Sequence, residues 1–171
     1  MWDATIRTLP LLPVRVRDAY LNGQGSMLAR IAGLITVVHD EDKPELTQAA
    51  LQRYLAEAAW FPTALLPSQG VRWSTIDEHT ALATLSDSSA SVSLAFHFNT
   101  QGEIIKVYTA QRFREVNGRY EPTPWAGHFR DYQERGGMRI PLEGEVEWQL
   151  GEKRLPYWRA RITSVEFDFA H

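Results

Sequence analysis

A chain of 171 residues with 44% hydrophobic and 23% charged residues has the size and composition of a single folded domain. Its net charge of −3 provides no dominant positive field, which argues against nucleic acid as the main partner. The absence of cysteine excludes disulfides, thiol chemistry and zinc sites built on thiolates.

The first forty residues are predicted to form strands. Residues 2–9 and 12–21 are strand candidates, and in the second of them valines alternate with arginines in the period-2 pattern of a half-buried strand. Asn22-Gly23 tolerates positive φ and predicts a hairpin turn. Residues 26–38 then predict one long strand that is apolar on both faces, which favours burial on both sides.

One main helix is predicted over residues 44–60. Pro44 suits the first helical position, where its missing N–H costs nothing. Pro62 biases Phe61 away from helical geometry and ends the helix. The apolar face of the helix is predicted from residues spaced by three and four, namely Leu51, Tyr54, Leu55 and Ala58.

The second half of the chain predicts strand after strand. Asn117-Gly118 is a strong hairpin signal, whereas the prolines in residues 119–125 indicate an edge or a loop. The apolar alternation of the last segment changes phase near Thr163–Ser164, which predicts a β-bulge there. The predicted strands are residues 71–76, 80–86, 91–99, 103–116, 126–134, 138–150 and 156–169.

About ten strands and one helix predict an α+β fold in a single domain over residues 1–171. Ten strands in one antiparallel sheet must curl strongly. The helix at about 44–60 is then expected to pack across the concave face and to cover the core.

The chain contains several long motifs, namely RYLAEAAWFPTALLP (53–67), VRWSTIDEHTALATL (71–85), RDAYLNGQGSM (17–27), PTPWAGHFRDY (122–132), RIPLEGEVEW (139–148) and YWRARITSVEF (157–167). Together they resemble an uncharacterised bacterial domain family of unknown function. This resemblance implies a fold like that of the bacterial lipoprotein-carrier proteins, in which a half-barrel sheet wraps around a hydrophobic cavity plugged by a helix. It implies no activity, because the family has none established.

Two sets of residues are candidates for a site. Large aromatic residues can line an apolar pocket, although they are also ordinary core fillers. Polar residues, four of them within the motifs, either tie helix to sheet or bind the polar head of a ligand, and in both cases they must be paired if they are buried. The expected pocket lining is Leu55, Trp60, Phe61, Trp73 and Phe96, and the expected polar network is Asp18, Arg53, Glu57, Asp77 and Arg112.

Catalytic and metal signatures are weak. The sequence has no GxSxG motif, and its five histidines lack the spacing of a ligand pair. We therefore expect no metal, no cofactor and no enzymatic activity. The alternative is a small enzyme that combines His97 with Asp18, Glu57 or Asp77.

These observations predict a non-enzymatic binding module for a lipid-like or other apolar ligand. A structural or interaction module, such as a homodimer formed through an exposed sheet edge, is a further alternative. The sequence begins without a signal-peptide pattern and has no apolar run long enough to span a membrane, so a cytoplasmic location is expected. The strand predicted from residue 2 also fits a chain that lacks an N-terminal segment, and with such a segment the protein would be periplasmic or membrane-anchored.

Overall fold

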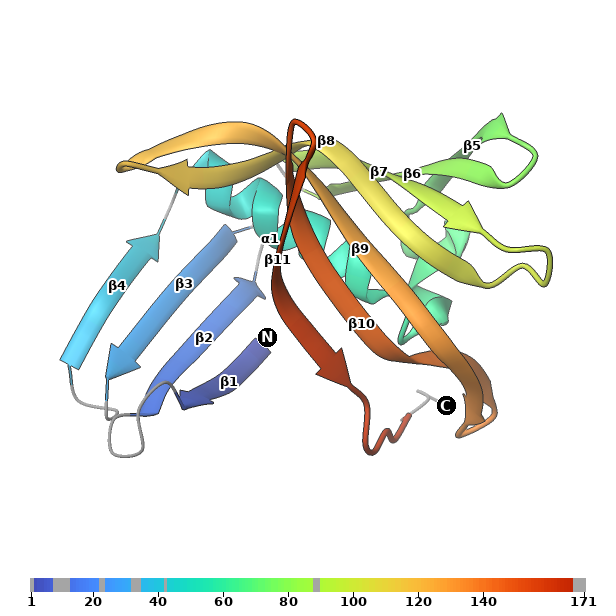
Figure 1. Ribbon diagram of the computed structural model, residues 1–171, viewed down its shortest axis with the longest axis horizontal. Coiled ribbons are helices and arrows are strands. Elements are labelled where there is room, and N and C mark those ends of the chain that lie inside the picture. Colours follow the sequence, from blue (N-terminus) through green and yellow to red (C-terminus); the bar gives the residue numbers. More distant parts are fainter. Residues whose placement is uncertain are drawn as a thin grey trace. The chain divides into compact units, whose positions relative to one another are not determined.

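A computed structural model describes residues 2–7, 13–21, 24–31, 35–41, 43–87 and 90–167, with side chains from Lys43 onward. Within these residues the chain forms eleven strands and one α-helix, so the predicted α+β class is confirmed (Figure 1). The strands belong to two antiparallel sheets, one of four strands and one of seven. The prediction of one sheet of about ten strands is therefore wrong, and its strong curvature is not confirmed.

The chain divides into two compact units, residues 1–54 with 86–92 and residues 55–85 with 93–171. The first unit contains the four-stranded sheet and most of the helix, and the second contains most of the seven-stranded sheet. The prediction of a single domain over residues 1–171 remains a prediction.

The four-stranded sheet is a simple meander in the order β1-β2-β3-β4. The long strand predicted over residues 26–38 is two strands, because the chain reverses direction between Ile31 and Ile35, which are paired in register. A continuous apolar run does not distinguish one long strand from two short ones. The turn predicted at Asn22-Gly23 lies outside the described residues. The four strands are β1 (Trp2–Arg7), β2 (Pro13–Leu21), β3 (Gln24–Ile31) and β4 (Ile35–Glu41).

The helix α1 (Pro44–Glu57) begins at the predicted proline and ends three residues earlier than predicted. Trp60 and Phe61 donate their backbone N–H groups to carbonyls three residues back, at 2.9 and 3.2 Å, so the chain tightens before Pro62. Two short 3₁₀ helices follow, η1 (Pro62–Leu65) and η2 (Pro67–Gln69). The α-helix therefore gives way to hydrogen bonds of three-residue spacing before Pro62 is reached, which the apolar pattern did not indicate.

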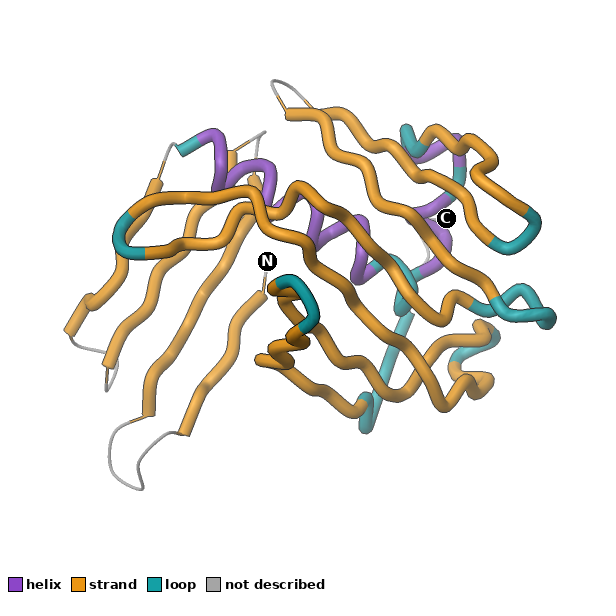
Figure 2. The backbone as a smooth tube through the Cα atoms, turned by 45° about the horizontal axis from the view of Figure 1, so that its top comes forward, coloured by secondary structure: helices purple, strands orange, loops and turns teal. Residues whose placement is uncertain are grey.

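The seven-stranded sheet has the order β11-β10-β9-β8-β7-β6-β5, so every strand neighbours the next one in sequence. Asn117 and Gly118 have φ of 51° and 78°, as their hairpin signal predicts. The long strands β8, β9 and β10 can be followed in Figure 2. The seven strands are β5 (Arg72–Asp77), β6 (Thr80–Asp87), β7 (Ala90–Phe98), β8 (Ile104–Val116), β9 (Arg119–Arg135), β10 (Met138–Leu150) and β11 (Lys153–Arg161).

Residues 119–125 were predicted as an edge or a loop, and they form the first part of β9, most of it with a neighbouring strand on one side only. They pair with β8 from Val116↔Arg119 onward, whereas the pairing of β9 with β10 begins only at Trp125↔Trp148. Pro122 therefore lies where β9 has a neighbour on one side only, and a proline there removes no hydrogen bond on the open side.

The last strand differs from its prediction in both length and irregularity. It covers Lys153–Arg161 instead of residues 156–169, and residues 162–167 form no regular element. Its bulge is at Tyr157, because Val146 pairs with Trp158 while Glu147 pairs with Pro156. The change of phase near Thr163–Ser164 follows the end of the strand and is no bulge.

The two faces of the seven-stranded sheet differ in polarity. One face is apolar and carries core side chains such as Phe96, Val107, Trp125 and Phe129. The other face is polar, and we call it the outer face. The alternation of side chains along each strand separates the two sets. On the outer face one row crosses five strands, namely His97, Lys106, His128, Glu145 and Arg159.

Candidate functional site

Trp60, directly after the helix, is anchored on the apolar face of the sheet. Its indole Nε1 donates to the Pro141 carbonyl at 2.9 Å. Its ring meets those of Phe129 and Trp158 edge-on, with centroid separations of 5.5 and 6.1 Å. A Cβ built on Gly144 would lie 2.8 Å from the Trp60 ring, so the indole fits only because position 144 has no side chain. Trp60 thus fixes the end of the helical segment to three strands.

Trp73 anchors the other end of the same segment. Its indole Nε1 donates to the Leu65 carbonyl at 2.9 Å, and its ring lies edge-on to Phe96 at 5.2 Å. Leu55 and Phe96 are fully buried, whereas Trp60, Trp73 and Phe61 are half-buried. Of the predicted lining residues, Trp60 therefore belongs to one aromatic group and Trp73 with Phe96 to another. Both indole N–H groups bond to protein carbonyls, so in this arrangement these tryptophans offer a ligand ring surface and not a donor.

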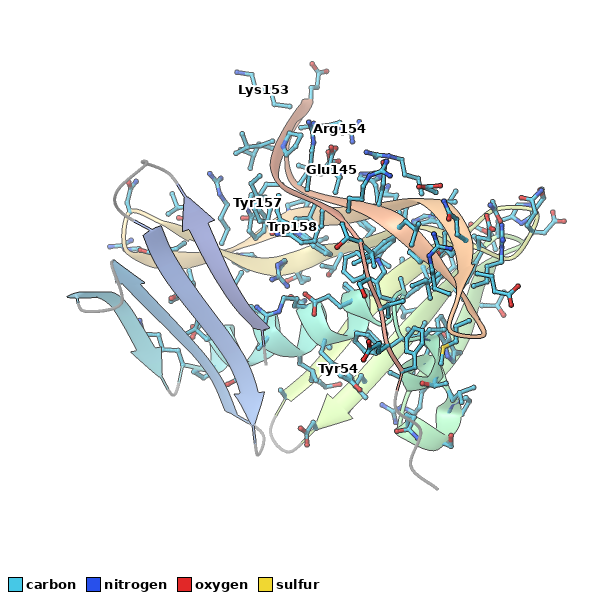
Figure 3. All side chains as sticks on the ribbon, turned by 90° about the horizontal axis from the view of Figure 1, so that it is seen from below. Tyr54, Glu145, Lys153, Arg154, Tyr157 and Trp158 are labelled. Carbon is cyan, nitrogen blue, oxygen red and sulfur yellow. The ribbon has the colours of Figure 1, made fainter. Side chains whose placement is uncertain are left out.

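An apolar surface remains exposed at the hairpin of β10 and β11. Trp148 and Leu155 are paired in register, and the Tyr157 ring stacks on Trp148 at 5.7 Å and 17°. Leu155 and Tyr157 are 44% and 50% exposed, which is unusual for large side chains beside an apolar core. Figure 3 labels Tyr157 and Trp158 on β11, with Lys153 and Arg154 nearer the turn. We call this surface the hairpin patch: Trp148, Leu150, Leu155, Tyr157 and Trp158.

A cationic group borders the hairpin patch. The Arg112 guanidinium lies over the Trp125 ring at 4.9 Å, and Trp125 Nε1 donates to the Tyr157 hydroxyl at 2.9 Å. Burial lowers the pKa of Arg112, although the Tyr157 hydroxyl and the Glu57 carboxylate act in the opposite direction. Two residues of the predicted polar network, Arg112 and Glu57, are therefore close enough to interact, and Tyr157 connects Arg112 to the patch.

The other residues of the predicted network belong to three different elements. Asp18 belongs to β2, opposite Trp2 and Met27, and its side chain is outside the description. Arg53 is half-buried on α1. Asp77 is exposed at the end of β5, on the opposite edge strand from β11.

Asp77 is the predicted acid that the structure relates to His97. Its carboxylate accepts the His79 backbone N–H at 2.9 Å, and this bond and one from the Thr80 hydroxyl lower the pKa of Asp77. The Thr80 hydroxyl in turn lies 3.2 Å from His97 Nδ1. Burial and the nearby Lys106 lower the pKa of His97, with Asp77 opposing them. Of the acids considered for catalysis, Asp77 is thus linked to His97 through one hydroxyl group.

The outer face holds a buried carboxylate that sequence reasoning missed. The Glu147 side chain is fully buried, and Arg154 Nε donates to its two oxygens at 2.9 and 2.7 Å. His128 Nε2 lies 3.2 Å from Glu147 Oε1, as does Gln149 Nε2. Burial alone would raise the pKa of Glu147, but the bonds to Arg154, Gln149 and His128 lower it to about 2. The alternation of Glu145 and Glu147 placed both on one face, but no sequence signal showed that only one would be enclosed.

Among the described residues, no group of three or more His, Asp or Glu side chains is placed to hold a metal ion. No helix in that part of the chain is long and apolar enough to span a membrane.

A comparison with protein-family models matches residues 1–167 to a family of unknown function, DUF6920. The chain belongs to this family. The match confirms the predicted resemblance to an uncharacterised domain family. The bacterial origin and the lipoprotein-carrier fold remain predictions. For this DUF6920 chain, comparisons with curated proteins and with solved structures gave no match.

Proposed function

We propose that this DUF6920 chain is a non-enzymatic binding module for a lipid-like molecule with an apolar body and an anionic head. The observation that carries the proposal is the hairpin patch with Arg112 beside it. A half-barrel fold like that of the lipoprotein carriers, with the apolar sheet face as its inner wall, is part of the same proposal.

The apolar body is expected to lie on the hairpin patch. Each Å² of apolar surface removed from water contributes about 25 cal/mol, so covering exposed side chains such as Leu155 and Tyr157 favours binding. Stacked aromatic rings offer a wide, rigid surface at little cost in side-chain entropy. Packed side chains such as Trp60 and Phe129 border this surface and give it a fixed shape.

The anionic head is expected to lie toward Arg112. Burial disfavours the charged form of this guanidinium, and a carboxylate or phosphate beside it would offset that cost. A guanidinium is also suited to bidentate contact with a planar anion. This assigns Arg112 to the head of the ligand and Glu57 to balancing its charge when the ligand is absent.

A catalytic role rests on a narrower observation. Asp77 and His97 are linked through Thr80, but Asp77 already accepts bonds that hold it as a carboxylate. No cofactor enters the proposal. Experiments can distinguish the proposed binding function from the enzymatic alternative and from the homodimer alternative.

The test is a titration of the protein with a fluorescent long-chain fatty acid. Binding is measured by energy transfer from tryptophan to the fluorescent group of the fatty acid. We expect saturable binding that Leu150→Glu/Leu155→Glu weakens at least tenfold. The matched control is Ile76→Glu, because Ile76 is 55% exposed on β5 and should leave the affinity unchanged.

A second comparison uses the primary alcohol with the same chain. It should bind more weakly than the fatty acid, and Arg112→Gln should remove that difference. Absence of saturable fatty-acid binding, or equal losses in the patch variant and the Ile76 control, contradicts the proposal.

A further inference from the structure

The outer face of β9, β10 and β11 carries rows in which basic and acidic residue types alternate from strand to strand. In one row Glu143 pairs in register with Arg130 on one side and Arg161 on the other. Arg130 Nε lies 2.5 Å from Glu143, and Arg161 also bonds to Glu143. In the neighbouring row Glu145 stands between His128 and Arg159, and Arg159 bonds to Glu145.

Both rows end on cations at the edge of the sheet. β11 is the terminal strand, and within the described part of the chain only β10 pairs with it. Its sequence, KRLPYWRAR, contains four basic residues and no acidic one. Arg159 and Arg161 are 70% and 62% exposed, whereas Glu145 and Glu143 are largely covered.

These arginines have the capacity for another anion. A guanidinium carries five N–H donors, so one carboxylate on the β10 side does not use them all. Arg161 has only a long contact, 3.9 Å, to a second acid, Asp131. The outer edge of a terminal strand also presents backbone N–H and C=O groups that can pair with a further strand.

The positive charge of the β11 edge determines which kind of strand can pair with it favourably. A second β11, laid antiparallel on the first, would bring arginines opposite arginines, which is unfavourable. A strand with carboxylates at alternate positions would instead continue both rows with the correct sign. Its intervening residues would lie on the apolar side of the sheet, where Leu155 and Trp158 are found, so apolar residues suit those positions.

We propose that the β11 edge binds an extended segment of a partner protein in which carboxylates alternate with apolar residues. The segment adds as an eighth strand beside β11, with its carboxylates on Arg159 and Arg161. Pro156 and the bulge at Tyr157 interrupt the regular edge, so the residues from Trp158 to Arg161 are the main pairing segment. This inference rests on the edge of β11 and on the two arginines of its outer face, and only the intervening residues of the segment would border the hairpin patch, at Trp158.

The test uses three synthetic ten-residue peptides and fluorescence anisotropy. One peptide alternates glutamate and valine, one has the same composition in two blocks, and one alternates lysine and valine. We expect only the alternating acidic peptide to bind the wild-type protein. We also expect Arg159→Gln/Arg161→Gln to weaken that binding at least tenfold and the exposed Arg119→Gln control to change it less than twofold.

Several results would overturn the proposal. These are no binding of the alternating acidic peptide, equal binding of the block peptide, or equal losses in the double variant and the Arg119 control. A wild-type dimer in sedimentation that the double variant dissociates would assign the edge to a second copy instead. The peptide comparison on the wild type stands even if the double variant unfolds. Fatty-acid binding by the double variant should be unchanged, which separates this inference from the proposed function.

Discussion

Gly144 and Trp60 show how one missing side chain positions a large aromatic residue on the apolar face of the sheet. The strand at Gly144 has ordinary negative φ, so the glycine is required by space and not by backbone conformation. A methyl group there would overlap the indole, and overpacking of this kind typically costs about 1–3 kcal/mol.

We therefore predict that Gly144→Ala lowers the free energy of unfolding by about 1–3 kcal/mol, measured by urea denaturation. In Trp60→Leu the obstructing ring is gone, so adding Gly144→Ala to that variant should cost less than 1 kcal/mol. Additive effects of the two substitutions would contradict the steric explanation.

Glu147 is the residue whose charge is most strongly held by its neighbours. Its pKa of about 2 in the folded protein lies below the ordinary 4.5. Since the folded pKa is depressed, the carboxylate contributes its stabilisation above about pH 4.5 and loses it as the pH falls toward 2.

We predict that Glu147→Gln is less stable than the wild type by about 1–3 kcal/mol at pH 7, because charge-assisted bonds to Arg154 are lost. The difference should shrink as the pH is lowered from 4.5 to 2 in urea titrations at fixed pH. Glu121→Gln, an exposed change on β9, is the control and should have no such pH dependence. A difference that stays constant with pH would show that Glu147 acts through packing alone.

At the scale of the element, the hairpin between β8 and β9 depends on backbone conformation. Gly118 has φ of 78°, and a Cβ built there meets no atom within 4 Å, so space is not the constraint. Gly118→Ala should therefore cost about 1 kcal/mol through strain at positive φ, measured by thermal unfolding. Asn117→Gly, at the adjacent positive-φ position, should be nearly neutral. A neutral Gly118→Ala would mean that the turn relaxes to another type.

Prediction of helices and strands from the sequence succeeded where local residue chemistry determines the element. It failed where the element depends on which strands pair. Alternation and the Asn117-Gly118 signal located β5 to β8 to within one or two residues, and Pro44 located the start of α1. The prolines of residues 119–125 indicated an edge, and residues 119–124 do have a neighbour on one side only, but the sequence did not show that this stretch continues into the long strand β9.

The candidate site was only partly predictable for the same reason. Large aromatic residues such as Trp60 and Trp73 could be selected by type, but whether an indole N–H is free depends on which carbonyl the fold brings near it. The hairpin patch could not be predicted, because exposure at Leu155 and Tyr157 follows from their being on a terminal strand with a bulge. Arg112 was among the expected polar residues, yet its contact with Trp125 depends on register across two strands.

At the scale of the whole molecule, the charged groups indicate how stability changes with pH. Four carboxylates have pKa values lowered by their bonds to donors, namely those of Asp77, Glu103, Glu143 and Glu147. Their stabilisation is complete above their ordinary pKa of about 4 and is lost as the pH falls below it. Acidification therefore weakens the fold, because the unfolded chain takes up protons that the folded chain resists.

His97 adds a loss of stability that begins at a higher pH than the loss caused by the carboxylates. Burial and Lys106 lower its pKa below the ordinary 6.5, with Asp77 opposing them, so the folded protein favours the neutral imidazole. Its contribution is present above pH 6.5 and is lost as the pH falls through that value toward the lower folded pKa.

We predict that Tm decreases in two stages, one beginning near pH 6.5 and one near pH 4.5. His97→Gln should remove the first stage, because glutamine can still bond to Thr80 but does not titrate. The exposed His79→Gln is the control and should keep both stages. If His97→Gln leaves the upper stage unchanged, the imidazole does not govern it, and another group must take up the proton.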